Sequence, residues 1–167
     1  MRNIVLARVD DRLIHGEVVM SWIPMTGTNR LIIVDDVLAN DPFGTRVVKL
    51  LVPPDKKCFI YTVDQAADKL MREGVPKEKI MVLAKTPMTF YRLVQAGVPI
   101  REVNLGGTGI DETRKPFFKN ISLSREEVDA VEKLLEGGCK VYYQLVPEQK
   151  AYDIENAVKE AKKAFEI

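Results

Sequence analysis

The chain has one histidine, His15, and the residues beside it suit chemistry with a phosphate group. The surrounding segment reads Asp10-Asp11-Arg12-Leu13-Ile14-His15-Gly16-Glu17. A neutral imidazole nitrogen is a competent nucleophile at neutral pH. Arg12 offers a planar fork of donors that matches phosphate oxygens, and Gly16 lets a ligand approach the backbone. These residue types indicate a site at which His15 meets a phosphate; the plain alternative is a histidine that only fills the core or the surface.

The flanking sequence predicts that His15 lies between a strand and a helix. An apolar run over residues 4–9 is typical of a strand, and residues 18–23 form a helical pattern that ends near Pro24. The first N–H groups of a helix have no partner within it and attract anions. We therefore expect the backbone from Ile14 to Glu17 to bind phosphate oxygens.

Short apolar runs alternate with amphipathic stretches along the rest of the chain. Strands are expected at 31–34, 57–61, 80–84, 102–105 and 140–145, with a short β excursion at 117–123, and helices at 40–52, 65–72, 88–96, 124–136 and 153–165. The strand runs are continuous and rich in Val, Ile and Leu, which favours strands buried on both faces of a parallel sheet. We expect residues 1–167 to form one α/β domain, a doubly wound and mostly parallel β-sheet with helices on both faces and room for an antiparallel edge strand. Within the first helix, Met20 is expected in the core, while Trp22 could face the core or a partner.

Further candidates lie just after the predicted strands, because ligands of parallel sheets bind beyond the carboxyl ends of the strands. They are Asp10, Asp36, Thr62, Lys85, Thr86, Gly106 and Gly107. Either Asp10 or Asp36 would hold the second ring nitrogen of His15 and set its tautomer. The others would frame the phosphate pocket. Each has a structural alternative, since Asp and Thr cap helices and glycines form tight turns.

Composition excludes several classes of function. Lys and Arg number 25 and Asp and Glu 24, a net charge of +1, which argues against binding nucleic acid through bulk charge. One histidine excludes a metal site that needs two. The two cysteines, Cys58 and Cys139, suggest no disulfide framework and favour a reduced, cytoplasmic setting. Neither a secretion signal nor a membrane-spanning run is expected, and the chain has no GxGxxG or Walker sequence.

Four segments occur together in one known protein family. They are residues 10–19 with Trp22, residues 34–36 with 39–42, Lys85-Thr86-Pro87, and residues 103–107. With them the chain resembles, over nearly its whole length, the mannose/fructose/sorbose-family IIB components of the bacterial phosphoenolpyruvate-dependent sugar phosphotransferase system (PTS). Two positions depart from the pattern: Glu17, where many members carry Gln, and Thr108-Gly109, where Met is commoner.

The resemblance implies a phosphoryl relay in the cytoplasm, at the inner face of the membrane. His15 would accept a phosphoryl group on Nδ1 from a phosphohistidine of a IIA protein or domain. It would then pass the group to a sugar held by the membrane partners IIC and IID. Arg12 and the backbone N–H groups from Ile14 through Gly16 to Glu17 would stabilise the transferring group, with no metal, nucleotide or other cofactor. The sequence leaves open the identity of the sugar and whether the apolar edges of the sheet support a homodimer.

A rival from another class is a receiver-like signalling domain that is phosphorylated on an aspartate. Acidic pairs at strand ends and the Lys85-Thr86 pair favour this interpretation, in which carboxylates would hold Mg²⁺. Against it, the third strand ends in Tyr61-Thr62, and the next aspartate is Asp64. The chemistry separates the two, because a phosphohistidine is labile in acid and stable in alkali, whereas an acyl phosphate is labile in alkali.

Overall fold

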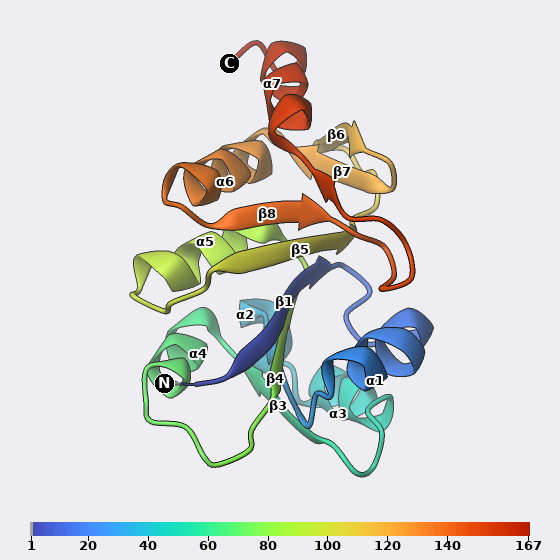
Figure 1. Cartoon of the computed structure of the whole chain (residues 1–167), viewed down its shortest axis with the longest axis vertical. Helices are drawn as coiled ribbons and strands as arrows, with labels where there is room; N and C mark the ends of the chain where they lie inside the picture. The colour runs from blue at the N-terminus through green and yellow to red at the C-terminus, as the bar shows by residue number, and fades with distance from the viewer. Residues whose placement is uncertain (1) are drawn as a thin grey trace.

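The computed structural model describes residues 2–167 and contains a seven-stranded sheet of order β3-β2-β4-β1-β5-β8-β9 (Figure 1). The strands are β1 (Ile4–Asp10), β2 (Arg30–Val34), β3 (Lys57–Tyr61), β4 (Ile80–Ala84), β5 (Glu102–Gly107), β8 (Lys140–Tyr143) and β9 (Tyr152–Asp153). Neighbouring strands are parallel except β8 and β9, which are antiparallel. This arrangement confirms the predicted fold class, including the antiparallel edge strand.

Helices cover both faces of the sheet. They are the π-helical turn η1 (Val18–Trp22), α1 (Ile23–Thr26), α2 (Asp36–Ala39), α3 (Pro42–Leu50), α4 (Val63–Leu70), α5 (Pro87–Gln95), α6 (Arg125–Glu136) and α7 (Glu155–Ala164). One hydrophobic cluster joins alternate strand residues such as Val82 to α4, α5, α6 and α7. A second cluster joins the intervening residues, such as Met81 and Leu83, to η1, α1 and α2. Because successive side chains of a strand point to opposite faces, burial on both faces explains the continuous apolar runs.

The first helix is longer than its sequence pattern indicates. It was expected to end near Pro24, but the helical backbone continues to Thr26 and stops at Gly27, which has a left-handed φ of 69°. The N–H of Ile23 bonds to the carbonyl of Val18, a π-helical spacing. Pro24 is the second residue of α1, directly after this π-helical turn.

Three further features differ from the sequence expectations. Residues 36–39 form α2, which the sequence pattern did not reveal. The predicted excursion at 117–123 is the second half of a hairpin made by β6 (Arg114–Phe118) and β7 (Ile121–Ser124). The prediction that Met20 lies in the core is wrong, because this residue is 79% exposed. Within the described range, 2–167, no helix has the length and apolar character needed to cross a bilayer.

Candidate functional site

A tight turn at the carboxyl end of β1 places His15. The N–H of Leu13 donates to the carbonyl of Asp10 at 3.0 Å, and Leu13 has a left-handed φ of 57° although its side chain is buried. Such a backbone is unfavourable for Leu by about 1 kcal/mol or more and is found mostly where a functional geometry requires it. The N–H of Val19 then donates to the carbonyl of His15 at 3.0 Å and opens the helix. The imidazole therefore lies at a helix start on the carboxyl edge of the sheet.

Asp10 fixes one nitrogen of the imidazole and leaves the other available. His15 Nε2 donates to Asp10 Oδ2 at 2.8 Å. The Asp10 side chain is fully buried, whereas that of His15 is 15% exposed. Among the hydrogen bonds of residues 2–167, none involves Nδ1 of His15. The carboxylate thus selects the tautomer in which Nδ1 carries the lone pair.

Two arginines complete the partners of Asp10. Arg12 donates to both carboxylate oxygens, from Nε and Nη2 at 3.1 Å each, and Arg8 Nη2 donates to Oδ2 at 3.2 Å. Burial alone would raise the pKa of Asp10. The hydrogen bonds from His15 and Arg12 and the charge of Arg8 outweigh burial and hold that pKa well below its ordinary value. Asp10 is therefore ionised throughout the physiological pH range.

Arg8 is a site residue that sequence reasoning missed. Its side chain is fully buried, and this burial lowers its pKa. Besides Asp10, it donates to Asn104 Oδ1 at 2.7 Å and to the carbonyls of Gln144 and Leu145 at 3.1 Å each. One signal was present in the sequence: an arginine inside an apolar strand, two positions before Asp10, projects from the same face of that strand as the aspartate.

Contacts of Arg8 explain why Trp22 lies in the core and why position 106 is a glycine. The guanidinium lies 5.1 Å from the ring centre of Trp22, whose indole N–H donates to Leu145 at 3.1 Å, so Trp22 belongs to the core. A Cβ at Gly106 would lie 2.1 Å from Cζ of Arg8. Position 106 therefore has to be glycine because the guanidinium passes directly over its backbone.

The backbone between Ile14 and Glu17 has the unpaired donors that the sequence predicts. Across residues 2–167, no backbone carbonyl accepts from the N–H groups of Ile14, Gly16 or Glu17. The side chain of Ile14 is buried in the second hydrophobic cluster, so only its backbone can serve a ligand. Glu17 Oε2 lies 3.7 Å from Arg12 Nη2.

A cleft of about 560 Å³ opens beside Arg12 and Glu17. Gly107 lines it, and a Cβ there would lie 3.5 Å from Arg12 Nη2. The hairpin tip supplies Lys119 and Asn120, two lining residues that the sequence did not indicate. Asn120 donates to the carbonyl of Gly106 at 2.9 Å and accepts from the hydroxyl of Tyr143. These contacts bring the hairpin, far along the chain, to the His15 edge.

Four of the predicted pocket residues do not line this cleft: Asp36, Thr62, Lys85 and Thr86. Asp36 accepts from the N–H of Val63 and from Arg92, at 2.9 Å each, and bonds neither to His15 nor to Arg12, so the carboxylate that holds the imidazole is Asp10.

Thr62 and Thr86 cap helices. Thr62 forms a capping box with Gln65 at the start of α4. Thr86 accepts from the N–H of Met88 and donates to Glu127 at 2.6 Å. Lys85 is exposed. Local capping chemistry therefore accounts for both threonines.

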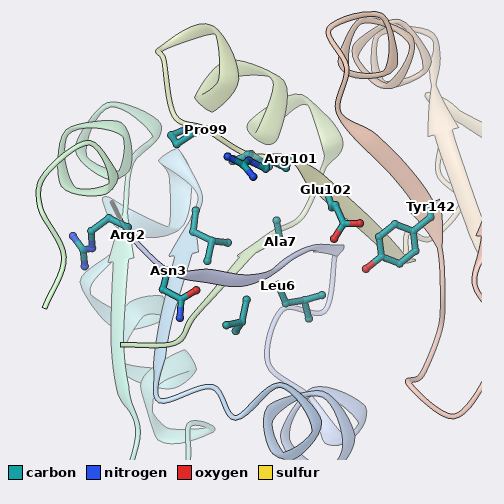
Figure 2. Close-up of a pocket in the computed structure, with 11 residues that line it drawn as sticks. Arg2, Asn3, Leu6, Ala7, Pro99, Arg101, Glu102 and Tyr142 are labelled. Atoms are coloured by element: carbon teal, nitrogen blue, oxygen red, sulfur yellow. The ribbon is translucent and has the colours of Figure 1, made fainter. Parts of the chain in front are cut away.

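A separate cavity lies at the opposite edge of the sheet (Figure 2). β1 and β5 pair only from Arg8 onward, and a space of about 350 Å³ lies against their amino-terminal parts. Side chains of Arg101, Glu102 and Tyr142 line it. It contains none of the residues around His15.

The chain is similar to known proteins over nearly its whole length. The family described as PTS system sorbose subfamily IIB component matches residues 4–166. The N-acetylgalactosamine-specific phosphotransferase enzyme IIB component 2 of Escherichia coli (strain K12) is 30% identical over 154 residues, which cover 92% of this chain and 98% of that protein. The PTS system sorbose-specific EIIB component of Lacticaseibacillus casei is 32% identical over 151 residues, 90% of this chain and 92% of that one.

A longer relative and a solved structure extend the comparison. The PTS system mannose-specific EIIAB component of Escherichia coli (strain K12) is 30% identical over 136 residues, which cover 81% of this chain but 42% of that protein. The crystal structure of the IIBSor domain of the sorbose permease from Klebsiella pneumoniae superposes with a TM-score of 0.88 at 28% identity, covering 95% of this chain and 98% of that one. The chain therefore belongs to the sorbose-subfamily IIB components of the sugar phosphotransferase system, which support phosphoryl transfer in sugar uptake.

Proposed function

We propose that this chain is a phosphocarrier that holds a phosphoryl group on Nδ1 of His15. It accepts the group from a phosphohistidine of a IIA protein or domain and passes it to a sugar held by the membrane partners IIC and IID at the cytoplasmic face. The observation that carries this proposal is the 2.8 Å contact from His15 Nε2 to Asp10, which leaves Nδ1 without a hydrogen-bond partner among residues 2–167 on a side chain that is 15% exposed.

The arrangement suits each bond change of the transfer. The lone pair of Nδ1 attacks phosphorus, the P–N bond of the donor breaks, and its electrons return to the donor imidazole. The ring of His15 becomes more positive as the new P–N bond forms, and the ionised Asp10 stabilises that charge through Nε2–H. In the second step a sugar hydroxyl attacks phosphorus and gives its proton to solvent water, while the P–N bond breaks and its electrons return to Nδ1.

Arg12 and the helix start stabilise the phosphoryl oxygens. Phosphoryl transfer depends mainly on positioning and on charge stabilisation at the equatorial oxygens. Arg12 uses Nε and Nη2 on Asp10, and the described residues 2–167 provide no acceptor for its Nη1. This group and the N–H groups of Ile14, Gly16 and Glu17 are the donors available to phosphate. Gly107 lines the cleft beside Arg12 without a side chain of its own.

The sugar belongs to the classes that the relatives' names give. Those names specify N-acetylgalactosamine, fructose, sorbose and mannose. The mannose relative is called EIIAB, which supports a IIA partner for this chain. Because Asp10 is buried among Arg8, Arg12 and His15, it is unavailable as a receiver-type phosphoacceptor, which supports histidine over aspartate.

The test is phosphorylation by the general PTS proteins and the matching IIA protein. The product should carry a phosphate that is labile in acid and stable in alkali, and nitrogen-15 NMR should place it on Nδ1. His15→Ala should abolish labelling, while Asp64→Asn, a control at the start of α4, should label like the wild type. An alkali-labile phosphate that survives in His15→Ala would overturn the proposal.

A further inference from the structure

Helix α3 turns an apolar stripe toward solvent. Phe43, Val47 and Leu50 follow the i, i+4, i+7 spacing of one helix face, and they are 68%, 43% and 84% exposed. The inward side of the helix is anchored by Val48, which packs against the second hydrophobic cluster. An amphipathic surface helix normally buries its apolar stripe. Here a second apolar face remains uncovered, and a shallow groove of about 550 Å³ runs along it.

The stripe begins at the edge of the sheet that carries His15. Helices α1 and α3 pack on the same face of the sheet (Figure 1), and α3 starts just after the carboxyl end of β2. The carboxyl ends of parallel strands meet at one edge, so the first turn of α3 lies at the edge that carries His15. Met20 and Val37 are also apolar and exposed there, at 79% and 81%. A partner that contacts both His15 and the first turn of α3 would bury an area of ordinary size, about 800 Å² per protein.

The charges beside the stripe restrict what can cover it. Arg46 and Lys49 line the same groove, and α3 has no acidic residue between Pro42 and Leu50. A second copy packed through this helix around a twofold axis would bring like charges together. Cytoplasmic loops of membrane proteins carry an excess of Lys and Arg, so they too would be repelled. The complementary surface is an apolar one with an acidic rim on a water-soluble protein.

We propose that the stripe of Phe43, Val47 and Leu50 is the docking surface for the IIA phosphoryl donor, with acidic side chains of IIA facing Arg46 and Lys49. This inference rests on the proposed function, because it takes the donor to be the protein that phosphorylates His15. The stripe supplies the apolar centre of the contact, and the loop from Asp11 to Glu17 supplies its reactive end. Docking through α3 leaves the groups that act on phosphorus unchanged.

The test is steady-state phosphorylation of the full chain by ³²P-labelled phospho-IIA. The double variant F43S/L50Q removes exposed side chains, so its fold should be kept. Its KM for phospho-IIA should rise about tenfold or more while kcat stays within twofold, because docking energy is present in both the bound complex and the transition state. M71Q is the matched control, since Met71 is 56% exposed at the end of α4 on the other face, and its KM should be unchanged.

A second double variant tests the charges of Arg46 and Lys49. R46E/K49E should raise KM at low salt and remove most of its dependence on ionic strength. An unchanged KM in F43S/L50Q, with a native circular dichroism spectrum, would overturn the inference.

A normal KM for phospho-IIA combined with loss of sugar phosphorylation in membranes carrying IIC and IID would also overturn it, by assigning the stripe to the membrane component. So would a normal KM combined with loss of binding to vesicles of anionic lipid. If His15 of the wild-type chain is not labelled, the proposed function itself is contradicted. The experiment therefore distinguishes failure of the docking proposal from failure of the phosphocarrier proposal.

Discussion

Three side chains are linked by hydrogen bonds at the site, from Arg8 through Asp10 to His15. Asp10 is the buried anion between two arginines and the imidazole, and each of its oxygens accepts at least two hydrogen bonds. A buried carboxylate with this many donors is stable in its ionised form, so Asp10 keeps its charge beside His15. Arg8 is fully buried, and it holds the charge and the orientation of Asp10.

Replacing Asp10 should lower stability in a pH-dependent way. The folded-state pKa of Asp10 lies below its unfolded value of about 3.9, so its contribution is fully present above that value and is lost as pH falls toward the folded pKa. Asp10→Asn should therefore lower the free energy of unfolding by about 3 kcal/mol at pH 7, because Arg8 is left buried without its counter-ion. Urea titrations should show this difference narrowing by about 1 kcal/mol at pH 3. A difference that is constant from pH 7 to pH 3 would contradict it.

Arg12→Lys should slow phosphoryl transfer without disturbing the fold. Lysine keeps the positive charge but cannot hold both oxygens of Asp10 while also facing the phosphate. We expect transfer from phospho-IIA to slow about tenfold, with the circular dichroism spectrum and the urea midpoint near those of the wild type. An unchanged rate would show that Arg12 serves structure alone.

At the scale of single residues, the sequence predicts those members of the His15 site that are close together along the chain. Asp10, Arg12 and His15 fall within six positions, so strand and turn rules are enough to bring them into one site. Arg8 lies two positions before Asp10, but its contacts with Asn104 and Gln144 join segments about a hundred residues away. Such contacts depend on the strand order, which local patterns do not reveal.

At the scale of elements, capping residues decide where the helices start and which threonines are free for chemistry. Thr62 and Ser124 each form a full capping box, with Gln65 and Glu127 three residues on. Ser124 and Glu127 have the Ser-x-x-Glu spacing of a capping box in the sequence as well. Thr62 follows a strand in the same way as the His15 segment does, and its side chain accepts a hydrogen bond from the N–H of Gln65.

Thr62→Ala should therefore cost stability and leave catalysis intact. Loss of the cap should lower the free energy of unfolding by about 1 kcal/mol and the melting temperature by about 3 °C. Ser124→Ala, which removes the same kind of cap from α6, is the matched comparison. Labelling by phospho-IIA should proceed at the wild-type rate in both variants. Slower labelling in Thr62→Ala alone would assign the hydroxyl to the phosphate site.

The β6–β7 hairpin and the first helix are the elements that the sequence predicts least well. The β6–β7 hairpin has an exposed strand with a proline, Pro116, and a turn at Lys119 with a φ of 49°, neither of which is a common hairpin signal. Met20 has the spacing of a core residue, but the π-helical turn shifts the register of its helix and turns it outward. Both outcomes depend on geometry that propensity alone does not contain.

At the scale of the whole molecule, the sheet is most stable at its centre. All five residues of β4 are buried, and β4 pairs with β1 on one side and β2 on the other. Its continuous apolar run is the reason that the sequence predicts the fold class correctly. The order of the strands and the gap between β1 and β5 are set by packing of whole layers, which no single segment encodes.

Native-state hydrogen exchange should follow this gradient. Amides of β4 and β2 should exchange only through global unfolding, whereas those of β9, a two-residue edge strand, should exchange through local opening. Exchange measured by NMR across a denaturant series separates the two routes. Equal opening free energies for β4 and β9 would contradict the expected gradient.

The close approach of Arg8 to Gly106 also constrains how this chain can change over generations. A side chain at 106 cannot be accepted while the arginine is present, because its Cβ would lie 2.1 Å from the guanidinium carbon. Loss of the arginine must come first, and that step strips Asp10 of a counter-ion and so harms the histidine's partner. The two positions are thus epistatic: Gly106→Ala should be lethal to folding beside Arg8 and tolerated beside a shorter residue. Because the site depends on one buried cation, most single substitutions at position 8 or 106 would damage either the fold or the partner of His15.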